Sequence, residues 1–529
     1  MRVVTGTTMR AADAWAISGG LPETALMYAA GRAVAAAARL WLRRRGRWPG
    51  RVLVVCGRGN NGGDGLVAAL ALANWGAEVE AVVCAEPEAL APAARLYWEA
   101  ARAAGCAVEA QPQPDARALA ARAQAADVVV DALLGTGVRG APRPPVEAVI
   151  GALEAAGRPV IAVDVPSGLD ADTGRAAGAA VAAVETVALG AAKLGCLTGP
   201  DHWRAGRVRV ADIGIPDAAY EAEEVRATAP FHPITAWGLK EAAGALPQRR
   251  PTGHKGTFGR VFILAGATGM SGAAALAARA ALRAGCGLVE VLVPEPVWPI
   301  VAALVPEALV HPAPADASGG LAAEAGEAAA ALAGRADVVL AGPGLGRAPG
   351  AAAALAHFLS AFRGPLVLDA DALALVEAAA LRRREAPVAL TPHAGELARL
   401  LGLTPEAVEA DRLAALHRAV AASGAAVVLK GAGSLTGAPD GRAWVNLTGN
   451  DGLATAGAGD VLAGLTAGLW AQAAAAGQLD GRRAPELLAA AVWLHGRAGD
   501  LAAARLGRRA LTAGELVRHL AAALREAER

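Results

Sequence analysis

Strand-length runs of apolar residues alternate with longer, alanine-rich stretches in the first half of the chain. Strands that are buried on both faces of a parallel sheet have this continuous apolar pattern, and alanine-rich stretches suit the helices that cover such a sheet. The pattern therefore predicts an α/β fold with a Rossmann-like parallel sheet. The expected strands are Arg51 to Cys56, Glu78 to Cys84, Asp127 to Ala132 and Pro159 to Asp164.

The alternation stops after the small-residue turn Ile213-Gly-Ile-Pro216 and resumes at Arg260. The segment between these two points is rich in Glu and Ala at its start and shows no pattern typical of a strand. We expect a first domain of residues 1–217, a linker at 218–235 and a second α/β domain of residues 236–527. The strands expected in the second domain are Arg260 to Leu264, Leu288 to Val293, Asp337 to Leu340, Pro365 to Asp369, Pro387 to Leu390 and Ala426 to Leu429.

Length and charge agree with two domains that bind small molecules. A chain of 529 residues is too long for one ordinary hydrophobic core. Only 4% of the residues are aromatic, so Ala, Val and Leu must supply the cores. The 50 Lys and Arg residues nearly balance the 49 Asp and Glu residues, so no basic field favours nucleic acid or a membrane surface.

Neither the cysteines nor the N-terminus indicates export. The five cysteines are scattered and form no C-x-x-C pair, so a disulfide framework or a zinc site is not expected. Residues Met1 to Met9 lack the features of a signal peptide, and we expect a cytoplasmic protein. The segment Val461 to Ala476 is strongly apolar but short and rich in Ala and Gly, which favours a buried helix over a membrane span.

A glycine-rich turn follows the first expected strand. Gly57, Gly59 and Gly62 match the G-x-G-x-x-G pattern, and Leu66 to Trp75 predicts a helix after them. Strand, turn and helix in this order place backbone N–H groups and a helix N-terminus against a phosphate. The alternative is a tight turn that needs glycine only for its backbone conformation.

An NAD-dependent dehydrogenase would use the same turn, with Glu78 or Glu80 on the ribose. Such a turn needs small residues beside the pyrophosphate. Asn60, Asn61 and Asp64 instead offer side-chain oxygens that suit hydroxyl or cation contacts. The turn therefore disfavours simple hydride transfer.

Polar residues follow two later strands, at the edge where open α/β sheets bind ligands. Asp131 lies at the end of one expected strand, and Ser167 follows another. Together with Asn61 they offer oxygen ligands of low formal charge, which suit potassium better than zinc. Taken alone, Asp131 would be interpreted as a helix or turn cap and Ser167 as a turn hydroxyl. The potassium hypothesis therefore depends on the two residues lying together.

These motifs resemble the N-terminal epimerase domain of NAD(P)HX repair enzymes. The resemblance rests on Gly59-Asn-Asn-Gly-Gly-Asp-Gly65, residues 131–137, Val163-Asp-Val-Pro-Ser-Gly168 and Asp212-Ile-Gly-Ile-Pro216. Tyr28 departs from it, because this family usually has an acidic residue there.

The resemblance implies a potassium site and a site for the hydrated cofactor. Asn61, Asp131 and Ser167 would bind the potassium ion, and Asp164 would be the catalytic proton donor and acceptor. The implied contacts of the hydrated cofactor are Asn60, Asn61, Gly62, Gly63, Asp64, Gly135, Thr136, Gly137, Val138, Arg139, Gly140, Ala141 and Asp164.

The second domain has glycine-rich or polar motifs after several expected strands. Because parallel strands end at one sheet edge, we expect these motifs to converge. They are Gly342-Pro-Gly-Leu-Gly346, Thr391-Pro-His393-Ala-Gly-Glu396, Lys430-Gly-Ala-Gly-Ser434 and the stretch from Asn450 to Asp460.

Asp460 ends the motif Gly457-Ala-Gly459-Asp460, which opens a helix expected from Val461 onward. The N-terminus of a helix stabilises developing phosphate charge, and an Asp there can accept the proton of a hydroxyl that attacks a phosphoryl group. The alternative for Asp460 is a simple N-cap. Alone, Lys430 would be a solvated strand end and His393 a turn histidine, so the catalytic interpretation rests on their clustering.

The arrangement resembles the ribokinase-like fold and, more closely, the ADP/ATP-dependent NAD(P)HX dehydratase. With the first domain, the resemblance covers nearly the whole chain. It implies that Gly344, His393 and Asp460 contact the hydrated cofactor, with Ala273 as a further contact. The implied nucleotide contacts are Lys430, Gly431, Ala432, Gly433, Ser434, Asn450, Gly452, Thr455, Gly457 and Gly459.

Together the resemblances imply a bifunctional, homo-oligomeric repair enzyme for NADHX and NADPHX. The first domain would interconvert the R and S epimers. In the second, Asp460 would activate the ring hydroxyl toward ADP or ATP carried with Mg²⁺, with ADP the favoured donor. Two alternatives remain: a sugar or vitamin kinase fused to a nucleotide-binding domain, which the Asn-Asn-Gly-Gly-Asp turn disfavours, and a nucleotide sensor, which has little need for Asp460.

Overall fold

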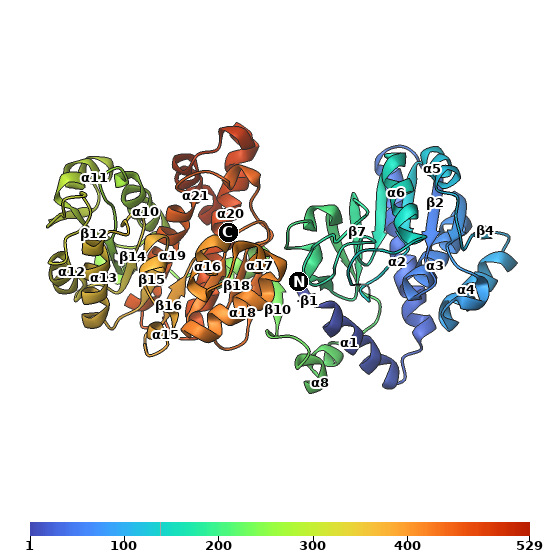
Figure 1. Cartoon of the computed structure of the whole chain (residues 1–529), viewed down its shortest axis with the longest axis horizontal. Helices are drawn as coiled ribbons and strands as arrows, with labels where there is room; N and C mark the ends of the chain where they lie inside the picture. The colour runs from blue at the N-terminus through green and yellow to red at the C-terminus, as the bar shows by residue number, and fades with distance from the viewer. Residues whose placement is uncertain (138) are drawn as a thin grey trace. The chain divides into compact units, whose positions relative to one another are not determined.

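The chain folds into two units, Met1–Pro233 and Ile234–Arg529. The computed structural model describes residues 1–137 and 139–529 (Figure 1). Val138, which is one of the implied cofactor contacts, lies outside the described residues. Each unit has its own sheet and its own buried core, which agrees with the α/β organisation expected from the sequence.

The first unit is built on a sheet of parallel strands in the order β4-β3-β2-β5-β6-β7-β9. Four of these strands were expected. The sequence pattern missed β4, β7 and β9. In β7 and β9 the apolar pattern is interrupted by Glu185 and Arg209, whose side chains form an ion pair. The strands are β2 (Arg51–Cys56), β3 (Glu78–Val83), β4 (Ala107–Ala110), β5 (Val128–Ala132), β6 (Val160–Val163), β7 (Glu185–Leu189) and β9 (Arg207–Ala211).

Alternate residues of β2 enter two separate cores, because successive side chains of a strand point to opposite faces. Val52 and Val54 pack with residues of α2 (Glu23–Arg44), α3 (Asn60–Asn74) and α4 (Pro92–Ala103). Leu53 and Val55 pack with residues of α5 (Ala116–Ala125) and α6 (Val146–Ala156). Burial on both faces explains why the sequence of β2 is a continuous apolar run.

The segment interpreted as a linker, residues 218–235, is largely folded. It contains α8 (Glu223–Arg226) and most of α7 (Asp217–Glu221), and β10 (Ile234–Ala236) begins at its end. Tyr220 and Val225 are buried in the core of the first unit. Helices of four and five residues are too short to show an apolar period, so the sequence pattern did not indicate them.

The second unit contains a larger sheet. Its strands β13-β12-β11-β14-β15-β16-β17 are parallel, β18 and β19 follow antiparallel, and β10 lies parallel to β19. All six expected strands are present. The strand bounds are β11 (Arg260–Leu264), β12 (Leu288–Pro294), β13 (Leu309–Ala313), β14 (Val338–Ala341), β15 (Leu366–Leu368), β16 (Val388–Leu390), β17 (Ala426–Leu429), β18 (Leu435–Gly437) and β19 (Ala443–Val445).

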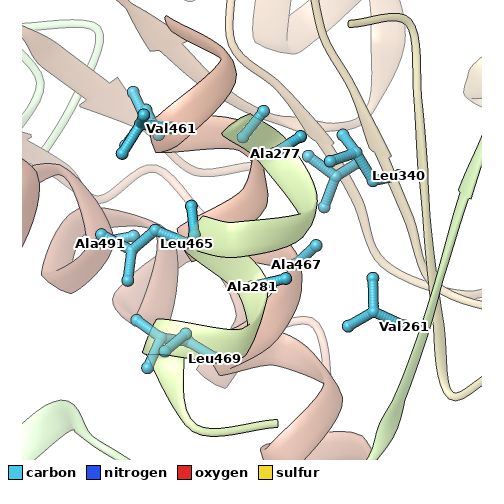
Figure 2. Close-up of a cluster of buried hydrophobic side chains, with 14 of the residues drawn as sticks. Val261, Ala277, Ala281, Leu340, Val461, Leu465, Ala467, Leu469 and Ala491 are labelled. Carbon is cyan, nitrogen blue, oxygen red and sulfur yellow. The ribbon is translucent and has the colours of Figure 1, made fainter. Parts of the chain in front are cut away.

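Two helices pack closely in the core of the second unit, α10 (Ser271–Ala284) and α19 (Ala458–Ala475), as Figure 2 shows. Gly464 and Gly468 allow this approach, since a Cβ on either would lie only 2.1 Å from the carbonyl oxygen of Ala277 or 2.6 Å from that of Ala281. The apolar segment in α19 is therefore a buried helix, as expected. No helix among the described residues is long and apolar enough to cross a membrane.

Further helices and strands complete the two units. Those of the first unit are β1 (Arg2–Val4), α1 (Gly6–Ser18) and β8 (Ala192–Lys193). Those of the second unit are α9 (Leu239–Ala245), α11 (Trp298–Leu304), α12 (Ala325–Ala333), α13 (Pro349–Ala361), α14 (Asp371–Leu375), α15 (Ala378–Leu381), α16 (Ala394–Leu401), α17 (Pro405–Ala410), α18 (Arg412–Ser423), α20 (Arg483–Leu506) and α21 (Ala513–Ala527).

Candidate active sites

A cavity of about 980 Å³ opens at the carboxyl ends of β2, β5 and β6 in the first unit. This is the edge at which open α/β sheets bind ligands, and the volume suits an organic ligand of cofactor size. Of the residues implied to contact the hydrated cofactor, the lining includes Asn60, Asn61, Asp64, Gly135, Thr136, Gly137, Arg139, Ala141 and Asp164.

Gly62 and Gly63 allow α3 to pack closely against the preceding turn and against α2. A Cβ on Gly62 would lie 1.9 Å from the carbonyl oxygen of Gly57, and one on Gly63 would lie 2.5 Å from the sulfur of Met27. Gly140 is exposed, with a φ of +79°. Tyr28 is 51% exposed on α2, whereas its neighbour Met27 lines the cavity.

We expect Gly62→Ala to destabilise the first unit by about 1–3 kcal/mol, because its Cβ would collide with the backbone of Gly57. Calorimetry should show a lower thermal transition for that unit. Gly59→Ala is the matched control, since no atom lies within 4 Å of a Cβ at Gly59 and its φ is −88°. Equal transitions for the two variants would contradict the packing role of Gly62.

Asp131 and Ser167 are hydrogen-bonded to each other, and Asn61, which lines the cavity, is linked to Ser167 through the backbone of Leu134. The Ser167 hydroxyl donates to Oδ1 of Asp131 at 2.6 Å, and the Ser167 N–H donates to Oδ2 at 2.8 Å. Nδ2 of Asn61 donates to the carbonyl oxygen of Leu134 at 2.9 Å, which leaves its Oδ1 for another partner. The Leu134 N–H in turn donates to the Ser167 hydroxyl at 2.9 Å.

Asp131 is a buried carboxylate that contacts only neutral donors within the described residues. Burial raises its pKa to about 6, although hydrogen bonds from Ser167 and Leu133 act in the opposite direction. A monovalent cation beside it would offset this cost. The oxygen-rich and weakly charged donor set therefore fits potassium.

Asp164 is held in an unusual conformation at the end of β6. Its φ is +67°, which non-glycine residues seldom adopt, and strain of this kind occurs at functional sites. Oδ1 accepts hydrogen bonds from the Leu189 N–H at 2.9 Å and from the ammonium group of Lys193. The Lys193 side chain is fully buried and also donates to the carbonyl oxygen of Leu189 at 2.6 Å. Asp164 is thus an oriented, ion-paired carboxylate in the cavity wall.

Two further acids line the same cavity as Asp164. Asp13 of α1 has its pKa raised to about 6, by burial and by nearby carboxylates, while the charge of Lys193 opposes the shift. Asp64 of α3 is almost fully buried, and its pKa is raised well above the ordinary value by burial first and then by the charge of Asp164. The sequence interpretation gave Asp13 and Lys193 no role.

In the second unit, the motifs after β14, β16 and β17 meet at one sheet edge, as expected from the parallel order of these strands. The structure adds Asp369, which follows β15 and is 1% exposed. Nζ of Lys430 lies 2.9 Å from Oδ1 of Asp369, and the Thr391 hydroxyl donates to the same oxygen at 2.8 Å. Nζ of Lys430 also lies 3.6 Å from Oε2 of Glu396.

The Lys430 ammonium also lies against the first turn of α19. A Cβ on Gly459 would lie 3.3 Å from it, so a glycine there permits the approach. Burial acts to lower the pKa of Lys430, but the charges of Asp369 and Glu396 outweigh it and raise that pKa. Lys430 is therefore a firmly protonated cation beside Asp460.

Asp460 is the third residue of α19 and not its N-cap. The helix begins at Ala458, three residues earlier than expected, because Gly457 occupies the N-cap position with a φ of +86°. No side chain caps this helix N-terminus. Burial, and then the charge of Asp369, raises the pKa of Asp460 to about 7, although Lys430 opposes the shift. Its carboxyl group is thus suited to exchange a proton near neutral pH.

The remaining implied contacts include His393, Gly344 and Asn450 on loops and Ala273 in α10. His393 caps α16, because its Nδ1 accepts a hydrogen bond from the Gly395 N–H at 3.0 Å, yet its side chain stays 60% exposed. A Cβ on Gly344 would lie 2.9 Å from Cβ of Ala273, so these two residues are neighbours. Nδ2 of Asn450 donates to Asp500 at 2.9 Å, which fixes the loop before α19.

Comparison with known proteins assigns a family to each unit. Residues 23–195 match the family model described as YjeF-related protein N-terminus, and residues 261–521 match that of NAD(P)H-hydrate dehydratase. The bifunctional NAD(P)H-hydrate repair enzyme of Moorella thermoacetica is 40% identical over 488 residues, which cover 90% of this chain and 88% of that one. This chain belongs to the bifunctional NAD(P)H-hydrate repair enzymes.

Another member of the repair enzyme family is similar over a comparable length, and a separate dehydratase is similar over the second unit. The enzyme of Thermofilum pendens is 37% identical over 508 residues, covering 96% of this chain and 93% of its own. The ADP/ATP-dependent NAD(P)H-hydrate dehydratase of Bacillus subtilis, crystallised with ATP and Mg²⁺, is 32% identical and covers 56% of this chain and 99% of its own, with a TM-score of 0.48.

Sequence patterns alone could have indicated two residues of this repair enzyme that were missed. Lys193 is an isolated charge in the apolar stretch Leu189-Gly-Ala-Ala-Lys-Leu, where burial of an ammonium requires a partner. Asp369 directly follows an apolar run, at a strand end like that of Asp131. Asp13 sits in an ordinary amphipathic helix, and no local pattern marks it.

Proposed function

We propose that this chain repairs hydrated NADH and NADPH in two steps. The first unit interconverts the R and S epimers of the hydrate, and the second dehydrates the S epimer at the expense of ADP or ATP. The observation that carries the proposal is Asp460, a carboxyl group with its pKa near 7 at an uncapped helix N-terminus beside the Lys430 cation. The chain's membership of the repair enzyme family supports both activities.

Dehydration requires the ring hydroxyl to become a better leaving group. Asp460 takes the hydroxyl proton while the oxygen attacks the terminal phosphorus of the nucleotide, and the bond to AMP or ADP breaks. The N-terminus of α19 and Lys430 stabilise the charge that develops on the phosphoryl oxygens. Phosphate then leaves with the carbon–oxygen electron pair, and the neighbouring ring carbon loses a proton, which restores the double bond of NAD(P)H.

Lys430 to Ser434 and Asn450 to Gly459 are proposed to hold the nucleotide. The Ser434 hydroxyl donates to the Gly431 carbonyl oxygen at 2.8 Å and so closes the first of these turns. The described residues contain no group of three or more His, Cys, Asp or Glu side chains placed to bind a metal. Mg²⁺ would therefore arrive on the phosphates of the nucleotide, as it usually does in phosphoryl transfer.

This part of the proposal is tested with the purified S epimer of NADPHX and ADP or ATP. We expect NADPH absorbance to rise with the release of one phosphate per NADPH. Release of phosphate without NADPH would favour a kinase or nucleotide hydrolase. Absence of turnover with retained nucleotide binding would favour a sensor. Cytoplasmic location and a homo-oligomeric state stay predictions.

We further propose that potassium binds at Asn61, Asp131 and Ser167. Binding at ten times the dissociation constant would stabilise the first unit by about 1.4 kcal/mol, because it offsets the buried charge of Asp131. The thermal transition should rise by roughly 3–6 °C in KCl over tetramethylammonium chloride at equal ionic strength. Asp131→Asn should abolish the difference. The same transition in both salts for the unmodified chain would contradict the potassium site.

A further inference from the structure

The first cavity contains two buried carboxyl groups, of which only one is paired with a cation. Asp64 and Asp164 both line the cavity and both are buried. Four Arg side chains and Lys193 also line it, but among the described residues only Lys193 forms an ion pair with either acid. Lys193 is ion-paired with Asp164. An isolated buried carboxylate is costly, so a carboxyl group that lacks a cationic partner keeps its proton.

Asp64 is the group that meets this condition. Its carboxylate has no ion pair within the described residues, and its pKa is raised well above the ordinary value by burial and by the charge of Asp164. Asp13 is less buried and has its pKa raised only to about 6, so it is mostly ionised at neutral pH. The titratable groups that act on Asp64, or on which it acts, are Asp13, Glu23, Cys56, Asp164 and Lys193.

We propose that Asp64 and Asp164 form an acid–base pair, in which Lys193 fixes Asp164 as the carboxylate and leaves Asp64 as the carboxylic acid. The inference rests on the proposed epimerisation and adds a second catalytic residue to it. Asp64 touches the substrate from α3 and Asp164 touches it from the end of β6, while Lys193 is a positioning residue that acts through Asp164.

The hydroxyl of the hydrate stands on the ring carbon next to the ring nitrogen, which allows epimerisation without any external reactant. Asp64 donates its proton to the hydroxyl, and the carbon–oxygen bond breaks with its electron pair on the departing water. The nitrogen lone pair forms a carbon–nitrogen double bond. Water then adds to the opposite face of the carbon and gives a proton to Asp164. Transfer of that proton back to Asp64 through water restores the site.

This assignment predicts a pH dependence with a definite sign. Asp64 must be protonated to act, so epimerisation should fall as the pH rises through its raised pKa. Lys193 lowers the pKa of Asp64, so Lys193→Met should move the fall in rate to a higher pH. Asp64→Asn should remove the pH-dependent fall from the activity that remains.

The experiment follows conversion of the purified R epimer of NADPHX to the S epimer without nucleotide, with the uncatalysed rate subtracted. We expect Asp64→Asn to lower kcat by about 10²- to 10⁴-fold with little change in KM, and Asp64→Glu to recover part of the loss. Asp115→Asn is the matched control, because Asp115 only caps the exposed N-terminus of α5. A rate for Asp64→Asn equal to that of the control would overturn the proposal.

Two outcomes separate this inference from the proposed function. An unmodified chain that does not epimerise would refute the function itself. An unmodified chain whose rate does not fall with rising pH anywhere in the range over which it stays folded would refute the acid role alone, and this measurement needs no variant to fold. The assignment would also be overturned if the fall in epimerisation rate at high pH disappeared in Asp13→Asn but persisted in Asp64→Asn.

Discussion

Asp460→Asn should abolish dehydration of the S epimer while nucleotide binding persists. The amide keeps the size of the side chain but cannot accept the hydroxyl proton, so kcat should fall by about 10²- to 10⁴-fold. The measurement is NADPH formation from the S epimer, with nucleotide affinity determined separately by calorimetry. Asp480→Asn is the matched control, because Asp480 is an exposed turn residue before α20 that accepts hydrogen bonds from Arg482 and Arg483.

The unmodified chain should also show a pH dependence that reports Asp460. The base acts when ionised and its pKa is about 7, so the rate should rise with pH through about 7 and then level off. Lys430 lowers the pKa of Asp460, so Lys430→Met should move the rise to higher pH. An Asp460→Asn variant that regenerates NADPH at the rate of the control would show that Asp460 is structural.

Asp164→Asn should abolish epimerisation and leave dehydration of the S epimer intact. The amide lacks the charge that pairs with Lys193 and cannot accept a proton, so a loss of about 10²- to 10⁴-fold in epimerisation is expected. R-to-S conversion is followed without nucleotide, and dehydration of the pure S epimer is followed in the same preparation. Epimerisation at full rate would leave Asp164 a purely structural role, whereas loss of both activities would indicate a general folding defect.

Most of the sheet architecture could be predicted from the chain, because strands buried on both faces have no polar alternation. This rule identified β2, β3, β5 and β6 and six strands of the second unit. It failed where polar side chains interrupt a strand, as in β9, and it also missed the short antiparallel strands β18 and β19. The helices of the expected linker were equally hidden by their length.

Candidate site residues could be picked out from the sequence only where they lie in motifs. Asn61 and Ser167 follow strands of one parallel sheet and Asp131 lies near the end of a third, so hydrogen bonds through Leu134 connect all three. Lys193 and Asp369 are partners of motif residues, and such pairings are made by the tertiary fold over separations of 29 and 61 residues. The position of Asp460 also needed the structure, because Gly457 and not Asp460 caps α19.

The most direct test of two activities in one chain uses a mixture of R and S NADPHX with ADP. We expect complete conversion of both epimers to NADPH by the unmodified chain, and Asp164→Asn should stop at the S fraction apart from slow uncatalysed epimerisation. Conversion of only the S fraction by the unmodified chain would contradict an active first unit, and absence of NADPH formation with both ADP and ATP would contradict the account as a whole.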